Sequence, residues 1–470
     1  MFYFVLHSVC TNFVRPMKVF ANKSDELLGF IREGRPLTGR EKLNLIVQLS
    51  IPSILAQITS VVMFFIDQAM VGHLGAKASA ACGLVETSTW LLGSLTGAAS
   101  MGFSVQVAHF IGANDFVKAR QVFRHALVVT TILSIVLMLV AVAIAHPLPY
   151  WLGGGDDIAH DASLYFLIFS LSGPFFQLNS LSGAMLKCSG NMRIPSMVSV
   201  IMCVLDVVFN YFLIFKAHLG VMGAAIGTSL SIVICGSAQA YIAVFRNKML
   251  SLRRVGEPFF WVADYLVNAL KIGLPMAVQS VLMSGAQIVG TMIVAPLGNI
   301  AIAANTLGIT AESLCYMPGY GIGEAATTLV GQSVGAGRGD LCRSFSRMTL
   351  YCGMAVMAVM GAVMFVFAPE MMGLMTPVEA IEQLGARCLR IEAFAEPMFA
   401  ASIIAVSVCV GAGDTLRPAI ISLCSMWFVR LTLAYMLSIH YGLVGVWIAM
   451  AVELTFRGLM LTWRLFRIKW

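Results

Sequence analysis

Charged residues are scarce in this chain of 470 residues. Asp, Glu, Lys and Arg together make up 11% of the sequence, hydrophobic residues make up 59%, and the mean hydropathy is +0.86. A soluble domain carries about twice that share of charge, so the composition predicts a protein surrounded by lipid. The net charge of +7 does not indicate nucleic-acid binding, because the basic residues lie in short loops between apolar runs.

Motifs with known chemistry are also missing. The sequence has no GxxxxGK(S/T) phosphate loop, no HExxH, no GxSxG and no Cys/His cluster at metal-ligand spacing. A primary pump is disfavoured, because ATP binding of that kind needs the phosphate loop. A membrane enzyme of the acyltransferase type is an alternative from a different class, but it needs an intramembrane His or Asp/His motif that the sequence lacks. We therefore expect neither a primary pump nor an enzyme.

Neither a disulfide framework nor a β-barrel fits the sequence. The 11 cysteines are odd in number and lie mostly inside apolar runs, which is not the pattern of paired cysteines. The apolar runs lack the alternation that membrane-spanning strands show. The expected fold class is an all-α integral membrane protein.

The apolar runs are long enough to cross a bilayer as helices, because a hydrocarbon core of ~30 Å needs about 20 apolar residues. They predict about twelve transmembrane helices, six in each half of the chain. In the first half the predicted spans are 45–71, 79–108, 125–147, 162–184, 196–216 and 220–245. In the second half they are 266–295, 302–331, 347–368, 388–411, 418–438 and 442–464.

The second half of the chain repeats the first with a displacement of 223 positions. Such matches between prolines and glycines indicate a duplicated membrane unit. Each half has an even number of spans, so both halves enter from the same side and the repeats are parallel. The matching pairs include Pro52 and Pro275, Gly112 and Gly335, Pro174 and Pro397, Gly190 and Gly413, and Pro195 and Pro418.

Basic residues gather on one side of the predicted bundle, and the opposite loops hold few, Lys77 and Lys216 among them. Because positive loops stay in the cytoplasm, we predict a multi-pass protein of the plasma membrane (the bacterial inner membrane) with both termini cytoplasmic. The basic loops are 109–124, 185–195, 246–265, 332–346 and 411–417. The predicted domains are a cytosolic N-terminal segment (1–43), a first lobe (44–245), a cytosolic linker (246–265) and a second lobe (266–470).

Carboxylates inside the apolar spans are the strongest functional signal. Burying one costs several kcal/mol by most scales, so it usually faces a cavity, a partner or an ion. Asp67 lies in the outer part of the first span, and Asp206 lies near the middle of the fifth. The position equivalent to Asp67 in the second half is Gly290, so the charge is not duplicated. The alternative is structural: each acid caps a helix or bonds a neighbouring Ser or Thr.

Other intramembrane polar groups are weaker candidates. Glu453 and Arg457 are four residues apart and are predicted to form a structural pair. Glu392 and Glu396 follow two arginines, Arg387 and Arg390, at helical spacing and could pair with them. Glu324 in the eighth span has no assigned role. The candidates for lining a cavity are Gln57, Met63, Met202, Asn210, Gln279, Gln287 and Glu324.

A resemblance to a known family is carried by four segments: IPSILAQ…IDQAMVGHLG (51–75), LDVVFNYFLIF…LGVMGAAIGTSLS (205–231), MPGYGIGEAATTLVGQSVGAG (317–337) and GAGDT (411–415). Together they resemble the multidrug and toxic compound extrusion (MATE) family over residues 45–465. The resemblance implies two six-helix lobes around a central cavity. It also implies export of organic cations and other amphiphiles in exchange for Na⁺ or H⁺, with no other cofactor. The expected partners are the small-molecule substrate and the lipid bilayer, and we expect a monomer.

The resemblance also suggests site residues. In the DinF-like branch an Asp of the first helix and an Asp of the fifth form the coupling centre, and a first-helix Pro bends there. Asp67, Asp206 and Pro52 occupy the matching positions. The polar residues that this branch places one turn before each Asp are Met63 and Met202 here, a departure from its pattern.

Two further considerations place the chain within that superfamily. The NorM-like and eukaryotic branches use a seventh-helix Glu, and the seventh span here has no acid, so the chain is closer to the DinF-like branch. The alternative function is a flippase for lipid-linked or polyprenyl substrates of the same superfamily, which usually has extra spans.

Overall fold

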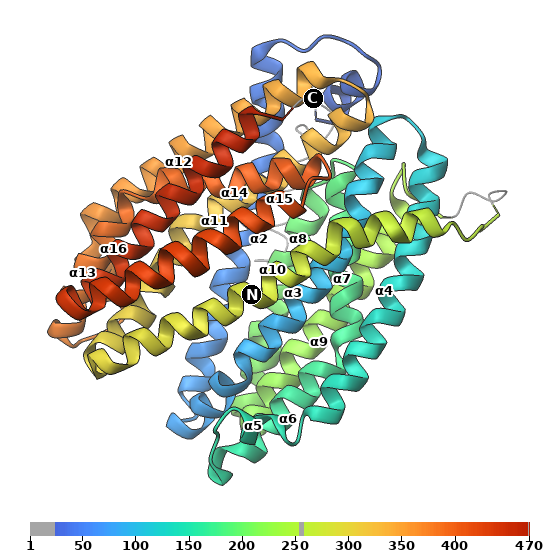
Figure 1. The fold of residues 1–470 in the computed structure, drawn as a ribbon. Helices are drawn as coiled ribbons and strands as arrows, with labels where there is room; N and C mark the ends of the chain where they lie inside the picture. Colours follow the sequence, from blue (N-terminus) through green and yellow to red (C-terminus); the bar gives the residue numbers. More distant parts are fainter. Residues whose placement is uncertain (1–23, 253–257, 469) are drawn as a thin grey trace, which may run out of the picture.

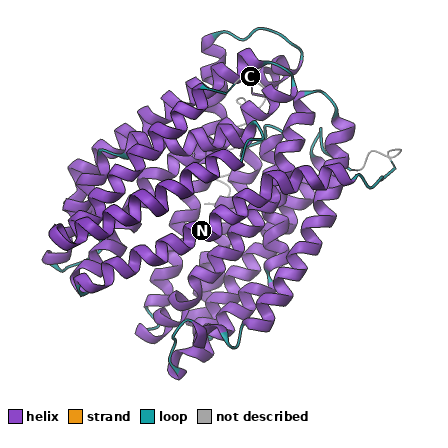
Figure 2. Cartoon of the chain, in the orientation of Figure 1, coloured by secondary structure: helices purple, strands orange, loops and turns teal. Residues whose placement is uncertain are grey.

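The structure is a computed structural model that describes residues 24–252, 258–468 and 470. Among these residues the regular elements are all helices, and no strand is present (Figure 2). The helices form two groups, drawn blue to green and yellow to red in Figure 1. The predicted fold class, an all-α membrane protein, is confirmed. The first part of the predicted N-terminal segment lies outside the described residues.

The helices from α2 to η2 are called the first lobe, and those from α10 to α16 the second lobe; the predicted limits of the lobes and of the linker stay a prediction. The first lobe contains α2 (Gly39–Gly72), α3 (Ala76–Gly112), α4 (Phe116–Ile144), α5 (Leu148–Trp151), α6 (Asp156–Leu171), α7 (Gly173–Cys188), α8 (Arg193–Tyr211), η1 (Phe212–Lys216), α9 (Gly220–Tyr241) and η2 (Ile242–Arg246). The second contains α10 (Ala263–Val294), η3 (Ala295–Leu297), α11 (Asn299–Gly335), α12 (Gly339–Gly373), α13 (Glu379–Ala393), α14 (Glu396–Gly411), α15 (Leu416–Cys424), η4 (Ser425–Arg430) and α16 (Leu431–Phe466).

The number of spans agrees with the predicted twelve. Among the described residues, nine helical stretches are long and apolar enough to cross a membrane, and two bent helix pairs bring the total to 11. One of the nine, Leu416–Phe466, has 51 residues, far more than a single crossing needs. Its backbone turns at Gly442, where φ is +57° and ψ is −137°, so it contains two crossings.

The fourth and tenth spans are bent, whereas the sequence predicts single helices there. α6 and α7 meet at 48°, and α13 and α14 meet at 58°. Pro174 lies in the first turn of α7, and Pro397 lies in that of α14. Proline is tolerated there because a first-turn N–H has no helical partner. The two prolines are repeat equivalents, so the bend belongs to the duplicated unit. By contrast, α2 continues through Pro52 as one helix, and the bend expected there stays a prediction.

The repeat extends to backbone geometry. Gly75 and Gly298 precede α3 and α11 as N-caps, with φ of +107° and +96°. Gly190 and Gly413 have φ of +89° and +85°. These angles lie in the left-handed region that favours glycine. Both pairs are separated by the displacement found in the sequence, so the two halves fold alike at these turns.

The lobes meet at the end of the bundle that carries the basic loops, here called the basic end. The first helix of each lobe packs against the second helix of the other, α2 on α11 and α10 on α3. A Cβ on Gly112 would lie 2.0 Å from the Gln332 carbonyl oxygen, and one on Gly335 would lie 1.9 Å from that of His109. These two contacts are repeat equivalents. The interface between the lobes, here called the seam, therefore has an approximate two-fold axis. Because glycine has no Cβ, the two backbones can approach this closely at these positions.

Away from the basic end the lobes diverge (Figure 1). Gly102 on α3 and Gly273 on α10 touch backbone of the other lobe. Farther from the basic end on the same two helices, Gly97 and Gly290 have open space where a Cβ would lie. The described structure is therefore closed between the lobes at the basic end and open toward the other end.

A short helix at residues 24–32 precedes the first span and lies across the seam. Its side chains Leu28 and Ile31 are 1% and 0% exposed, and they share a hydrophobic cluster with Phe345 of the second lobe. A Cβ on Gly190 of the first lobe would lie 2.2 Å from Leu28. Part of the segment predicted to be cytosolic therefore packs onto both lobes.

Replacing Leu28 with alanine should lower the free energy of unfolding by about 2–4 kcal/mol, the cost of leaving a cavity at a fully buried leucine. Thermal unfolding of the purified protein, followed by intrinsic fluorescence, measures the change. Glu26→Ala, at an exposed position of the same helix, is the control and should leave the midpoint unchanged. Equal midpoints for Leu28→Ala and the wild type would show that this helix does not pack on the bundle.

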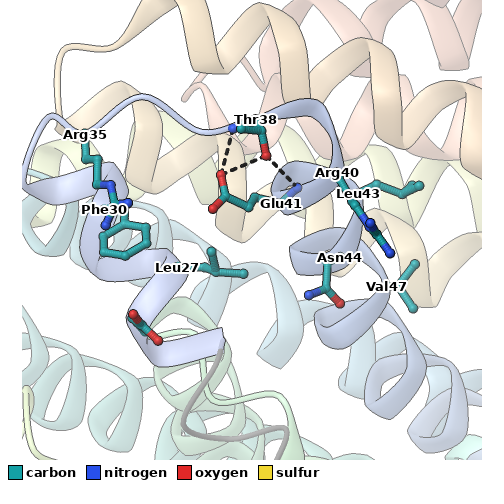
Figure 3. Close-up of a pocket in the computed structure, with 10 residues that line it drawn as sticks. Leu27, Phe30, Arg35, Thr38, Arg40, Glu41, Leu43, Asn44 and Val47 are labelled. Carbon is teal, nitrogen blue, oxygen red and sulfur yellow. Dashed lines mark hydrogen bonds between the residues drawn. The ribbon is translucent and has the colours of Figure 1, made fainter.

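The same helix forms one wall of a cavity of about 760 Å³ at the basic end (Figure 3). The Arg35 guanidinium lies 4.2 Å from the centre of the Phe30 ring. Thr38 and Glu41 form a capping box that starts α2: the Thr38 N–H donates to Glu41 at 2.8 Å, and the Glu41 N–H donates to the Thr38 hydroxyl at 3.3 Å. No predicted site residue lines this cavity.

Candidate functional site

Asp67 and Asp206 come close together inside the first lobe. Asp67 is on α2 and Asp206 is on α8, two helices that pack against each other. The Asp206 side chain is completely buried, and Asp67 is half-buried. Two carboxylates from distant parts of the chain thus share one place among apolar spans.

The Asn210 side chain joins the two carboxylates. Its amide donates to Asp67 Oδ1 at 2.9 Å and to Asp206 Oδ2 at 3.1 Å. Asn210 follows Asp206 by one turn of α8, so both side chains lie on one face of the helix. Gly227 on α9 leaves the necessary room, because a Cβ there would lie 2.1 Å from Asn210 Oδ1. Of the cavity-lining candidates, Asn210 is therefore the one that belongs to the carboxylate cluster.

Hydroxyl groups of α9 complete this cluster. Ser231 donates to Asp206 Oδ1 at 3.3 Å, and Thr228 Oγ1 lies 3.5 Å from the Asn210 amide. The described partners of both acids are neutral, so no fixed cation balances the pair. Like charges disfavour joint ionisation in such a place, and the arrangement can therefore hold a proton or a small cation. Among the described residues no three His, Cys, Asp or Glu side chains are grouped as a metal site.

The partners differ from those expected from the family pattern. Met63 and Met202 offer only a thioether sulfur, a soft ligand that suits neither a proton nor Na⁺. The oxygen and amide groups come from α8 and α9 instead. Thr228 and Ser231 are absent from the sequence-based candidates, although both lie in the family-like segment 205–231.

Glu324 is the centre of a second polar group, and this one crosses the seam. Its Oε1 accepts from Lys187 Nζ at 2.5 Å and from the Gln57 amide at 3.1 Å. Its Oε2 accepts from the Ser53 hydroxyl. Lys187 falls within the predicted basic loop 185–195, but α7 continues to Cys188, so the predicted start of that loop is wrong. Lys187 is a helix residue with an ion-pair partner.

The last two cavity candidates join neither group. Gln279 is half-buried and Gln287 is exposed on α10, and the hydrogen bonds described for residues 258–468 do not link them to either cluster. They lie on α10, whose one acid, Asp264, is in its first turn.

The buried glutamates of the second lobe follow the predicted pairing only in part. Glu453 pairs with Arg457 at 3.3 Å, as predicted. The carboxylate oxygens of Glu392 and Glu396 lack a hydrogen-bond partner in the described part of the chain, and Arg390 donates to a backbone carbonyl instead. The predicted pairing with the preceding arginines is therefore wrong. Glu392 shares α13 with both arginines but lies two and five positions from them rather than three or four, and Glu396 lies beyond the bend, at the start of α14.

Comparison with known proteins agrees with the fold and the repeat. The MatE family model matches the chain twice, over residues 52–212 and 275–436. The two matches begin 223 positions apart, the displacement that the prolines and glycines show.

Relatives align along nearly the whole chain. The "Probable multidrug resistance protein NorM" of Thermotoga maritima is 25% identical over 419 residues, 88% of this chain and 90% of that protein. The "Multidrug resistance protein NorM" of Burkholderia vietnamiensis is 26% identical over 433 residues, 89% and 92% of the two chains. A MOP superfamily transporter from Pyrococcus furiosus, described as having a binding pocket of reverse polarity, has a similar fold, with a TM-score of 0.85 and 21% identity over 90% of this chain and 95% of its own.

These findings do not separate the branches of the family, so the placement near the DinF-like branch stays a prediction. MATE proteins are secondary transporters and not enzymes, in line with the absence of catalytic motifs from the sequence. Because the family model covers more than half of the chain, in two copies, this protein belongs to the MatE family, the multidrug and toxic compound extrusion transporters.

Proposed function

We propose that the protein is an antiporter that exports organic cations or amphiphilic compounds in exchange for Na⁺ or H⁺. The observation that carries the proposal is the pair of carboxylates, Asp67 and Asp206, joined by Asn210 inside the first lobe. Acids without a fixed cationic partner in an apolar bundle need a mobile cation or proton. The relatives named for multidrug resistance support a drug-like or amphiphilic cargo.

Exchange requires that ion and cargo influence each other. If ion binding changes the affinity for cargo by 5- to 150-fold, the coupling free energy is about 1–3 kcal/mol, and cargo then changes ion binding by the same factor. The proposed coupling groups are on α2 and α8, and α2 also packs against α11 of the second lobe. A change at Asp67 can therefore reach the seam through a single helix.

Export from vesicles tests the proposal. Purified protein in liposomes is given tetraphenylphosphonium, a lipophilic organic cation, with an inward gradient of Na⁺ or of H⁺ imposed separately. One gradient should drive export and the other should not. If neither gradient moves the cation and a fluorescent lipid-linked probe crosses between leaflets instead, the flippase alternative replaces this proposal.

We further propose that the basic end faces the cytoplasm of a bacterial cell, as the positive loops predict. Single cysteines at Lys118 and Asp340, 57% and 65% exposed at the basic end, should react with a membrane-impermeant thiol reagent only from the cytoplasm. Cysteines at Lys77 and Leu374, 75% and 90% exposed at the other end, should react only from outside. The background must lack the 11 native cysteines. Labelling of any one position from the wrong side contradicts this orientation.

A further inference from the structure

Glu324 receives all of its described hydrogen bonds from the other lobe. The carboxylate is on α11 of the second lobe, whereas the Lys187, Gln57 and Ser53 donors are on α7 and α2 of the first. The Lys187 and Glu324 side chains are 26% and 27% exposed. Both groups can therefore be reached from the surrounding space, unlike the completely buried residues of the seam.

Glu324 is the outermost member of a polar stripe on α11. Thr328 and Gln332 follow it at intervals of four residues and so lie on the same face. The Thr328 hydroxyl donates to the Lys187 carbonyl at 3.2 Å, and the Gln332 amide donates to the Cys188 carbonyl at 2.8 Å. These two bonds hold the end of α7 against α11 nearer the basic end. The ion pair therefore lies on the side of the stripe toward which the lobes diverge.

Opening of the seam at the basic end would remove all three described donors from Glu324 at once. They move with the first lobe, while the carboxylate moves with the second. An ionised carboxylate left alone within an apolar span is strongly unfavourable, so either a proton or another cationic group has to take the place of Lys187. An organic cation drawn from the cytoplasm has that charge. Tyr320, one turn before Glu324 and 43% exposed, offers an aromatic face to the same cation.

We propose that Glu324 binds the cationic group of the transported compound, and that Lys187 displaces this group when the lobes close at the basic end. Lys187 thus competes with the cargo for Glu324. In the described state the Lys187 ammonium is bound to Glu324, so the cargo has lost its carboxylate partner. The cargo can then leave toward the end where the lobes diverge. This inference rests on the proposed export of organic cations, and it names the residues that recognise and release the cargo.

Binding of tetraphenylphosphonium to the purified full-length protein in lipid nanodiscs tests the inference. Glu324→Gln should weaken binding about tenfold, because the phosphonium loses its attraction to the carboxylate charge. Lys187→Gln should strengthen binding by a similar factor, because the competitor is gone, and Lys187→Arg should not. In the Glu324→Gln background, Lys187→Gln should have no further effect, since the two residues act on the same site. Triphenylphosphine oxide, an uncharged compound of similar shape, should respond to none of these changes.

Lys42→Gln is the matched control, because Lys42 also bonds across the seam, to Ser344 at 3.0 Å, without touching Glu324. It should leave tetraphenylphosphonium binding unchanged. Size-exclusion elution and the thermal midpoint show whether each variant is folded. If Lys187→Gln does not fold, the affinities of Glu324→Gln and Lys187→Arg still test the inference. Affinities within twofold of the wild type for both Glu324→Gln and Lys187→Gln would overturn the inference, as would an undiminished Lys187→Gln effect in the double variant. If these changes in binding are observed but no gradient drives export, the result contradicts the proposed function and not the cation site at Glu324.

Discussion

Asp67→Asn and Asp206→Asn should each reduce gradient-driven export to the level of empty vesicles. Asparagine keeps the size of aspartate but carries no charge, so it neither balances a cation nor releases a proton. The two carboxylates are joined by a single Asn210 amide, and loss of one charge leaves a site that holds the ion too weakly to drive exchange. Uptake of tetraphenylphosphonium into inverted vesicles under each gradient measures the loss.

The control for this experiment is Glu86→Gln. Glu86 is another intramembrane acid of the first lobe, and its carboxylate accepts from Gln68 at 3.4 Å rather than from Asn210. This variant should keep most of the export rate. All variants must reach the membrane in amounts like the wild type. If Asp67→Asn or Asp206→Asn exports at the wild-type rate, that residue is not a coupling group.

The spans could be predicted from the sequence because lipid imposes a simple rule on length and polarity. The bends in the fourth and tenth spans also have a signal in the sequence, because Pro174 and Pro397 occupy equivalent positions of the two repeats. A proline in an apolar run does not by itself show whether one helix ends and another begins, however: α2 continues through Pro52 as one helix, while each of the other two prolines lies in the first turn of a new helix.

The group around Asp67 and Asp206 could be predicted from the sequence, whereas the group around Glu324 could not. Asp67 and Asp206 are conspicuous as bare acids in apolar runs, and the family resemblance brings them together. The pair of Lys187 and Glu324 spans 137 positions and two lobes, so it depends on how the lobes dock, which no local pattern encodes. In the sequence, Lys187 is also one of many basic residues near a loop, and such residues are usually explained by their role in setting the membrane topology.

Gly335→Leu and Gly112→Leu should each arrest the transporter with the basic end open. A Cβ at these positions would lie 1.9 Å and 2.0 Å from carbonyl oxygens of the other lobe, and helix backbone cannot move aside as a side chain can. If the clash costs about 3 kcal/mol, at the upper part of the usual range for overpacking, the closed arrangement falls roughly 100-fold in population. Export should fall accordingly, because every cycle passes through that arrangement.

The two substitutions should give the same phenotype, because Gly112 on Gln332 and Gly335 on His109 are equivalent contacts across the approximate two-fold axis. Gly290→Leu is the control: it places the same side chain in a helix of the seam, at a position with open space around it, and should export normally. A cysteine at Ala108, 1% exposed in the closed seam, should react with a thiol reagent from the basic end faster in both arrested variants. Normal export by Gly335→Leu would mean that the lobes do not close in this way during transport.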